Sequence, residues 1–378
     1  MDSNNQINTA TSPLRYFQAL HKMPELSGQE KETSHYIARQ LRSFGLEVKC
    51  DIEGSTAVAA TLRGSQPGPV LALRADMDAL PFVGEDGSPC AIHACGHDAH
   101  SAMLLATAQR IAAEGVLPRG EIRFIFQPAE ELATGAKMLL KSGILEGVDG
   151  IVGIHLRSRQ EAELHEATPC LCHGATGLLR ARILGSNAHA AQPHQGINAI
   201  DAAALAVMSI NAVRVDPQIP HSAKVTGITS HGSAVNIIPA EADLSVDLRA
   251  QTNPVMQQLL EKVSDAMHAA AACIGASAEL GAPSVTAAAE PDSRMTELAR
   301  QAMEGVVERI IPVIRTSGGE DFHFFSSLGH IPSAFIGLGC GMTSQLHKPD
   351  MSFDHTALED GTRILCNFVK LFFDYFAD

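Results

Sequence analysis

The chain has 378 residues, of which 45% are hydrophobic and 19% charged, and its formal net charge is −14. This length and composition allow a sizeable hydrophobic core, in about two or three domains, without the help of disulfides. The negative charge argues against binding to nucleic acid or to an anionic membrane, because their phosphates would repel the protein.

The N-terminal stretch MDSNNQINTATS is polar and has neither the basic nor the apolar region of a signal peptide. No apolar run approaches the ~20 residues that a membrane span needs. The eight cysteines are scattered along the chain, which favours a reducing compartment over a disulfide framework. These features predict a cytoplasmic protein.

The first half of the chain alternates between predicted strands and helices. The stretch MPELSGQE is typical of a loop that ends in a capping box, with Ser27 at the N-cap and Glu30 three residues later. An apolar run at 70–73 predicts a strand buried on both faces. Helices are expected at 98–111 and 130–141, and further strands at EIRFIFQ and GIVGIH. This alternation predicts a mostly parallel sheet with flanking helices, an α/β fold.

The middle of the chain has a different order of elements. The strand GLLRARILG precedes a helix at 196–211, the alternating strands AKVTGITS and AEADLSVDLRA, a helix at 254–273 and the strand ASAELG. The order βαββαβ predicts a split βαβ sandwich, an α+β domain.

After this stretch the chain returns to helix and strand alternation. RIIPVIR and PSAFIGLG are expected to be strands, and a final helix is expected near the C-terminus. We therefore expect one α/β domain formed by residues 1–176 and 285–378, with an α+β domain inserted at 177–284.

Polar clusters follow three of the predicted strands. HACGHDAH, with Cys95 and His97, lies after the strand at 70–73, and QPAEE, with Glu131, follows EIRFIFQ. His155 ends the strand GIVGIH. Because open α/β sheets bind ligands at the carboxyl ends of their strands, these side chains are expected to converge.

A thiolate, a carboxylate and imidazoles are ligands that zinc and similar ions prefer. His347, in the loop SQLHKPDMSFDH, adds a further imidazole. Five ligands are too many for one tetrahedral ion and suit two ions that share a bridge. Each residue alone is more typical of a structural role, so it is their joint pattern that predicts the metal site.

Seven motifs occur in one order: RADMDALP, HACGHDAH, FQPAEE, GIH, GSNAHAAQPHQGINAI, NIIPAEADLSVDLRA and GGEDF. Together they resemble the dinuclear-metal aminoacylase/carboxypeptidase family. The branch they resemble is that of the amidohydrolases typified by hippurate hydrolase and the auxin–amino acid (IAA-amino acid) conjugate hydrolases. The resemblance extends over nearly the whole chain.

The resemblance implies two divalent metal ions, zinc or manganese, in the α/β domain and dimerisation through the inserted domain. It implies that Cys95 bridges the two ions and that Glu130 is the general base. It also implies the remaining metal ligands, which are His97, Glu131, His155 and His347.

The inserted domain and a later loop supply further candidates. By resemblance, His189 reaches the active site of the other subunit and stabilises the oxyanion, and Asn236 and Arg249 contact the substrate. Arg249 could hold a carboxylate with two hydrogen bonds. Gly318 and Gly319 could form an anion-binding nest of backbone amides. Without the resemblance, these residues would be expected in ordinary surface and loop positions.

Two segments depart from the family pattern. The stretch HLRSRQE after His155 is charged, where the branch often has aromatic residues, so a bulky aryl substrate is not implied. The loop SQLHKPDMSFDH fits the family pattern only with two extra residues between Pro349 and Phe353, which makes His355 a rival to His347 as the last ligand.

The sequence therefore predicts a homodimeric metal-dependent amidohydrolase that cleaves N-acyl amino acids, or related amides, with a metal-activated water. A dipeptidase or small carboxypeptidase with the same site is the nearest alternative. A cysteine hydrolase with Cys95 as nucleophile and a non-catalytic amide-binding or metal-buffering protein are further alternatives.

Overall fold

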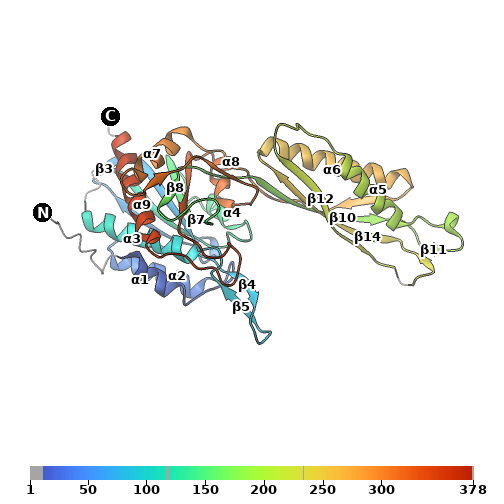
Figure 1. Cartoon of the computed structure of the whole chain (residues 1–378), viewed down its shortest axis with the longest axis horizontal. Coiled ribbons are helices and arrows are strands. Elements are labelled where there is room, and N and C mark those ends of the chain that lie inside the picture. Colours follow the sequence, from blue (N-terminus) through green and yellow to red (C-terminus); the bar gives the residue numbers. More distant parts are fainter. Residues whose placement is uncertain (1–11, 116–118, 233, 377–378) are drawn as a thin grey trace. The chain divides into compact units, whose positions relative to one another are not determined.

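The chain divides into two compact units (Figure 1). The computed structural model describes residues 12–115, 119–232 and 234–376, so most of the N-terminal stretch in which no signal peptide is expected lies outside them. Unit 1 comprises Met1–Cys172, Glu290–Ile314 and Glu320–Asp378, and unit 2 comprises His173–Ala289 and Arg315–Gly319. Within the described ranges, no helix is long and apolar enough to cross a membrane.

A mixed sheet forms the centre of unit 1, in the order β1-β2-β6-β3-β7-β19-β8-β17. Its four central strands, β6, β3, β7 and β19, are parallel to one another. All eight residues of β7 are buried, as expected of a parallel strand covered on both faces. The strands are β1 (Glu47–Lys49), β2 (Val58–Arg63), β3 (Gln66–Asp76), β6 (Arg119–Gln127), β7 (Gly150–Arg157), β8 (Glu166–Thr168), β17 (Arg309–Ile310) and β19 (Ser333–Gly339).

The helices of unit 1 pack on this sheet and on one another. α3 contacts α1, α9, β3 and β7, whereas α4 packs against β6 and α8. Along α9, buried apolar residues recur at the three- and four-residue spacing of one helix face, which anchors this helix in the core. The helices are α1 (Pro13–Leu20), α2 (Lys31–Ser43), α3 (His97–Glu114), α4 (Gly135–Lys141), α7 (Ser293–Met303), α8 (Phe324–Ser327) and α9 (Ala357–Tyr375).

Short elements complete unit 1 and the connections between the units. In the sequence, a hairpin of β4 (Leu80–Val83) and β5 (Pro89–Ile92) separates β3 from α3. β9 (Leu171–His173) and β18 (Ile314–Thr316) occur where the chain passes from one unit to the other.

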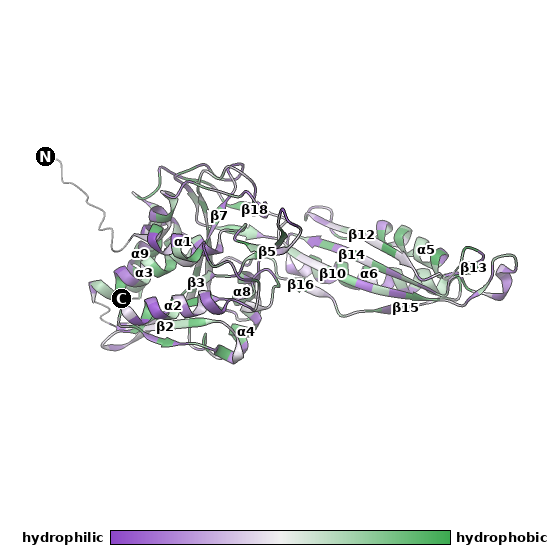
Figure 2. Cartoon of the chain, turned by 90° about the horizontal axis from the view of Figure 1, so that it is seen from below, coloured by the Kyte–Doolittle hydropathy of each residue, from purple (hydrophilic) through white to green (hydrophobic). Residues whose placement is uncertain are grey.

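Unit 2 has the predicted βαββαβ order. It consists of β10 (Ala175–Leu184), α5 (Ala199–Ala212), β12 (His221–Ser230), β14 (Glu241–Ala250), α6 (Asn253–Cys273) and β15 (Ser277–Leu280), with the short strands β11 (Ala188–His189), β13 (Ile237–Ile238) and β16 (Ser284–Thr286). The strand order is β12-β14-β10-β15, and β16 also pairs with β10. Hydrophobic and hydrophilic residues alternate along β10 and β14, so one face of the sheet is buried under the helices (Figure 2). The predicted fold class, an α/β domain with an inserted α+β domain, is confirmed.

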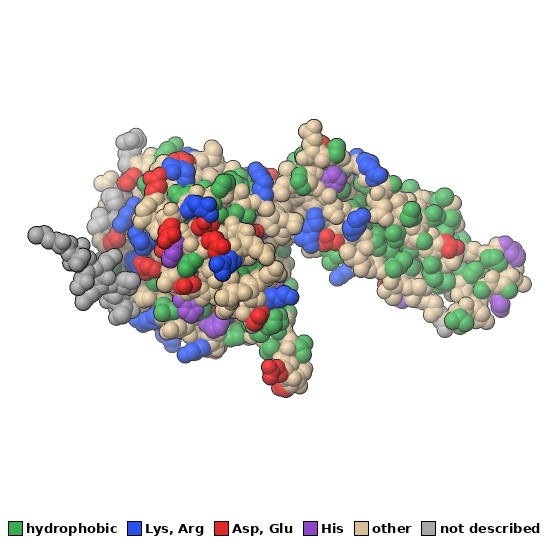
Figure 3. Space-filling view, in the orientation of Figure 1, with side chains coloured by type: hydrophobic (Ala, Val, Ile, Leu, Met, Phe, Trp, Pro, Cys, Tyr) green, Lys and Arg blue, Asp and Glu red, His purple; other side chains and the backbone are tan. Residues whose placement is uncertain are grey.

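Apolar side chains also lie on the surface of unit 2. On α5, Ile200, Leu205 and Met208 are exposed, and Met208 keeps 68% of its surface accessible. Ile228, on the neighbouring strand β12, is also exposed. Hydrophobic side chains accordingly gather on the visible face of unit 2 (Figure 3).

Two local predictions are wrong. The helix expected at 130–141 begins only at Gly135, because Ala129 and Ala133 adopt left-handed backbone angles that a helix cannot contain. The capping box expected in MPELSGQE does not form, since the Glu25 carboxylate accepts the amides of α2 instead, from Glu32 at 3.1 Å and Thr33 at 2.9 Å.

Candidate metal centre

The candidate ligands lie at one edge of the large sheet, where its parallel strands end. The turn that carries Glu130 and Glu131 follows β6, and His155 lies near the end of β7. Cys95 and His97 stand on either side of Gly96, whose left-handed φ of 86° starts α3. A side chain at Gly96 would approach Leu156 Cδ1 to 3.1 Å, so glycine fits this close passage best.

The ligand atoms are spaced as they would be around metal ions. Cys95 Sγ lies 3.6 Å from His155 Nε2, and Glu131 Oε1 lies 4.0 Å from His97 Nε2. His347 Nε2 is 3.7 Å from the same carboxylate oxygen of Glu131. Ligands bound at ordinary metal distances in a tetrahedron would be about 3.3–3.8 Å apart.

Cys95 belongs to two groups of possible ligands whose atoms lie within 4.8 Å of one another. One group adds His97 and His155, and the other adds Glu131 and His347. His97 Nε2 and Glu131 Oε1 are buried and have no hydrogen-bond partner in the described part of the chain. Because buried polar atoms rarely go unpaired, these two atoms and the shared thiol fit a pair of metal ions.

Asp78, to which the sequence assigned no role, organises this cluster. Its carboxylate accepts hydrogen bonds from the amides of Glu130 (3.2 Å) and Glu131 (3.1 Å) and from the Ser27 hydroxyl (2.7 Å). His97 Nδ1 lies 3.0 Å from the Asp78 carbonyl oxygen and 3.2 Å from its carboxylate, which leaves Nε2 for a ligand. In the sequence, the acidic stretch DMD at the end of a buried strand marks Asp78 as a candidate site residue but does not indicate this role.

Burial and neighbouring charges shift the pKa values of His155 and His97 in opposite directions. Burial lowers the pKa of His155 well below its usual value, so this ring is neutral and able to bind a cation. Burial also opposes a charge on His97, but the Asp76 carboxylate and other neighbours outweigh it and raise the pKa of His97 well above its usual value. A metal ion bound at His97 would therefore displace a proton from this ring.

Glu130 lies beside the ligands in a buried group of carboxyls. Its Oε2 is 3.9 Å from His97 Nε2, and its Oε1 accepts the Asp321 amide at 3.3 Å. Burial, aided by Glu320 and Asp321, raises the pKa of Glu130 well above its usual value. A carboxylate with a raised pKa is suited to accept a proton near neutral pH.

Arg74 compensates the charge of this group. Its buried guanidinium donates to Asp76 at 2.6 Å, to Asp321 at 2.9 Å and to Glu320 at 3.3 Å. Despite this cation, burial raises the pKa of Glu320 to about 7 and that of Asp321 to about 6. The acidic residues of GGEDF thus form a buried network behind Glu130.

The loop after β19 brings His347, and not its rival His355, to the cluster. The His347 amide donates to the Ala94 carbonyl at 2.7 Å, next to Cys95. The His355 ring instead packs on Phe17 and Phe353, with ring centroids 4.7 and 5.2 Å away. The two extra residues in the loop do not prevent His347 from reaching Glu131.

Burial argues against Cys95 as a catalytic nucleophile. It raises the pKa of the thiol above its usual range, despite the nearby His97. Reactive cysteines are instead accessible and have a lowered pKa. A metal ion would provide the compensation that a thiolate at this position needs.

The other predicted residues, His189, Asn236, Arg249, Gly318 and Gly319, lie in unit 2. His189, on β11, is exposed and accepts the Ala191 amide at Nδ1. The Arg249 guanidinium makes two hydrogen bonds to Asp247, at 2.9 and 2.8 Å. The Gly318 amide donates to the Thr316 hydroxyl at 3.3 Å, so it is not free for an anion nest. Asn236 is exposed, and its carbonyl accepts the Ala190 amide.

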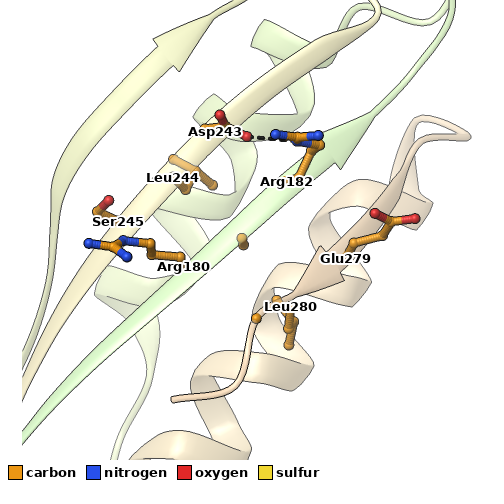
Figure 4. Close-up of a pocket in the computed structure, with 9 residues that line it drawn as sticks. Arg180, Arg182, Asp243, Leu244, Ser245, Glu279 and Leu280 are labelled. Carbon is orange, nitrogen blue, oxygen red and sulfur yellow. Dashed lines mark hydrogen bonds and ion pairs between the residues drawn. The ribbon is translucent and has the colours of Figure 1, made fainter. Parts of the chain in front are cut away.

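A pocket of about 530 Å³ on unit 2 contains none of these candidates. Arg180, Arg182, Asp243 and Glu279 line it, and an ion pair joins Arg182 to Asp243 (Figure 4).

Comparison with known proteins agrees with this site. A model of peptidase family M20/M25/M40 matches residues 72–371. N-acetyl-L-cysteine deacetylase of Bacillus subtilis (strain 168) is 30% identical over 368 residues, which cover 94% of this chain and 86% of the relative. N-acyl-L-amino acid amidohydrolase of Geobacillus stearothermophilus is 39% identical over 249 residues, which cover 63% of this chain and 67% of the relative.

A crystal structure from Bacillus subtilis, described as a dinuclear metal-binding peptidase of the M20 family, has the same fold. Its TM-score is 0.80 at 27% identity, and the match covers 96% of this chain and 98% of that one. The family resemblance in the sequence motifs is thus confirmed, and this chain belongs to peptidase family M20/M25/M40.

Proposed function

We propose that this protein is a metallo-amidohydrolase that hydrolyses N-acyl amino acids. The observation that carries the proposal is the convergence of five ligand side chains beside the buried carboxyl of Glu130. Relatives named for deacetylase and amidohydrolase activities support the same reaction class. The ligands of the two divalent ions would be Cys95, His97, Glu131, His155 and His347.

The bound ions would supply Lewis acidity, which polarises the amide carbonyl and makes a water molecule easier to deprotonate. The chain's own residues handle the proton. Glu130 would take it from the attacking water and deliver it to the nitrogen of the leaving amine. The raised pKa of Glu130, due to burial and to neighbouring carboxyls, suits both transfers.

Unit 2 would provide contacts to the substrate. His189 would donate to the developing oxyanion. Asn236, Gly318 and Gly319 would contribute polar contacts, for which the Gly318 amide would exchange its hydrogen bond to Thr316. Arg249 would bind the substrate carboxylate, for which it would exchange its hydrogen bonds to Asp247.

A homodimer would bring His189 to the site of the partner subunit. Support comes from the exposed apolar residues of α5 and from β12, which pairs only with β14 among the described strands. Such an unpaired edge beside an apolar helix face is suited to a second copy of the chain. Residues 177–284 would then serve as the dimerisation domain, and 1–176 with 285–378 as the catalytic domain.

No disulfide joins any of the eight cysteines, all of which lie in the described part of the chain. Thiols that are not oxidised to disulfides persist in reducing compartments. We therefore place the protein in the cytoplasm as part of this proposal.

A dipeptidase or small carboxypeptidase is the second candidate, because the matched crystal structure is described as a peptidase. The two reactions differ only in the acyl group of the substrate. Arg157, at the end of β7, and Arg159 pair with Glu161 and Glu163. If this charged segment lines the acyl pocket, it would favour polar or small acyl groups.

The test is an activity panel with metal-free protein and with protein reconstituted with zinc or manganese. N-acetyl and N-benzoyl amino acids and dipeptides are the substrates. We expect metal-dependent hydrolysis of N-acyl amino acids, with the better metal identifying the native ion. Preference for dipeptides would select the second candidate, and equal activity without metal would refute both.

A further inference from the structure

Glu30 is a fully buried carboxyl that the proposed reaction does not use. It forms no ion pair among the described residues and accepts three hydrogen bonds. Its Oε1 accepts the amides of Gly28 (2.8 Å) and Ala129 (3.0 Å), and its Oε2 accepts the Thr56 hydroxyl (2.6 Å). Burial raises the pKa of Glu30, and these donors oppose the rise.

The contact with Ala129 crosses 99 positions of sequence and reaches the turn before Glu130. Ala129 has a φ of 54°, a left-handed conformation that costs energy for a residue with a side chain. The Ala129 amide is the first N–H of the turn, because Pro128 before it has none, and Ala129 is buried. Glu30 is the group that satisfies this amide and so holds the left-handed peptide in place.

Three successive amides of this turn bind two carboxyls. The Ala129 amide donates to Glu30, and the amides of Glu130 and Glu131 donate to Asp78. The Ser27 hydroxyl also donates to Asp78, so the segment 27–30 supplies one of the two carboxyls and contacts the other. The loop before α2 thus restrains the turn through these hydrogen bonds.

We propose that Glu30 is a positioning residue for Glu130, acting through the hydrogen bond to the Ala129 amide. This inference rests on the proposed function, because it assumes that Glu130 transfers the proton. Glu30 itself touches neither substrate nor metal. Its role is to fix the backbone from which the Glu130 side chain extends.

The role depends on an acceptor at Oε1 and not on the charge. Glu30→Gln keeps an oxygen that can accept the amides of Gly28 and Ala129, whereas Glu30→Ala removes it. We expect kcat to fall about 10²-fold in Glu30→Ala, since a displacement of about 1 Å at a catalytic group has that effect. Glu30→Gln is expected to keep kcat within about threefold of the unchanged protein, with KM little changed in both variants.

Glu25→Ala is the matched control. Glu25 lies in the same loop and also accepts two backbone amides, but these amides belong to α2 and not to the turn. This variant should lose stability and keep kcat. All assays are made on the metal-loaded protein well below each variant's unfolding temperature, with metal content measured in parallel.

Hydrogen–deuterium exchange of peptides spanning the turn gives a readout that does not depend on activity. The turn should exchange faster in Glu30→Ala, and at the original rate in Glu30→Gln and Glu25→Ala. If Glu30→Ala does not fold, Glu30→Asp, which draws the acceptor back by one methylene, should show the same loss.

Unchanged exchange and unchanged kcat in Glu30→Ala would overturn the proposal, as would equal damage in Glu30→Gln. If the unchanged protein hydrolyses no N-acyl amino acid or dipeptide, the proposed function fails instead. In that case, exchange still reports whether Glu30 holds the turn.

Discussion

At the scale of single residues, the adjacent glutamates of QPAEE have different surroundings and should respond differently to substitution. Glu130→Gln keeps the shape of the side chain but cannot accept a proton. We expect kcat to fall by about 10²–10⁴, the usual contribution of a general base. Metal content, measured by elemental analysis, should stay unchanged.

Glu131→Gln is the comparison for this prediction. Its Oε1 faces His97 and His347, so the substitution replaces an anionic candidate ligand with a neutral amide and should lower metal content together with activity. Full turnover in Glu130→Gln would remove Glu130 from the mechanism.

Asp78 offers a second prediction at this scale. Its carboxylate accepts every hydrogen bond it makes, so Asp78→Asn places an NH₂ group against a donor. The His97 ring and the turn would lose their fixed orientation, and metal affinity should fall about 10–100-fold. Competition with a chelator at fixed pH measures this.

Ser27→Ala serves as the control, because it removes only the hydroxyl contact to Asp78. It should change metal affinity much less. Equal affinity of Asp78→Asn and the unchanged protein would contradict the role assigned to Asp78.

The convergence of the candidate ligands could be predicted because thiol, imidazole and carboxylate groups are chemically distinctive and follow buried strands. The roles of Asp78 and Glu30 could not, since each holds backbone amides from a distant segment. Any residue can supply a backbone amide, so such a contact leaves no pattern in the sequence.

At the scale of elements, one ion pair links the loop before β8 to α9 and should make stability depend on pH. His165 Nδ1 lies 2.6 Å from Asp360 Oδ2, and this hydrogen bond raises the pKa of His165 above 6.5. The stabilisation is therefore fully present below pH 6.5 and is lost as the pH rises through the raised pKa of His165. Burial raises the pKa of Asp360 despite this partner, so the cost of burying the carboxylate offsets part of the stabilisation by the pair.

His165→Asn tests this link, because asparagine tolerates the left-handed φ of 61° and can still donate to Asp360 without titrating. We expect the unchanged protein to lose up to about 1 kcal/mol more stability than the variant between about pH 6 and about pH 8. Denaturant unfolding at both pH values measures the difference. The other histidines contribute equally to both proteins, so their contributions cancel. An identical pH dependence of the two proteins would refute the link.

The long elements could be predicted from their periodicity, but the turn at residues 130–134 could not. Alanine is the strongest helix former, and the composition of this stretch predicts a helix. The contacts of its amides with Glu30 and Asp78 outweigh that preference and hold Ala129 in a left-handed conformation. Tertiary contacts thus override local propensity where the candidate base is placed.

At the scale of the whole molecule, the alternation of elements predicts both the α/β unit and the βαββαβ order of the second. The strand order of the large sheet could not be predicted, because β19 pairs with β7 from about 180 residues further along the chain. The assignment of β12 and α5 to a dimer interface is open to a direct test.

Met208, the most exposed apolar residue of α5, is the position for that test. A charge there would be buried without a partner in a dimer, so Met208→Asp should shift the protein toward monomer. Light scattering after size exclusion measures the shift. Leu328→Asp, at an exposed leucine of unit 1, should leave the mass unchanged, and a dimeric Met208→Asp would exclude this face.

The proposed homodimer also predicts how two inactive variants behave together. In the His189→Ala homodimer, every site keeps Glu130 but lacks His189. In the Glu130→Gln homodimer, every site keeps His189 but lacks the Glu130 carboxylate. If His189 acts on the partner subunit, a mixed dimer contains one complete site and one that lacks both groups. Random exchange makes half of the dimers mixed, so the mixture should recover about a quarter of the original activity. If His189 acts within its own chain, every site stays incomplete. The measurement is the activity of the two variants after they are unfolded and refolded together, with each variant treated alone as the control. No gain in activity would rule out that His189 is shared between subunits.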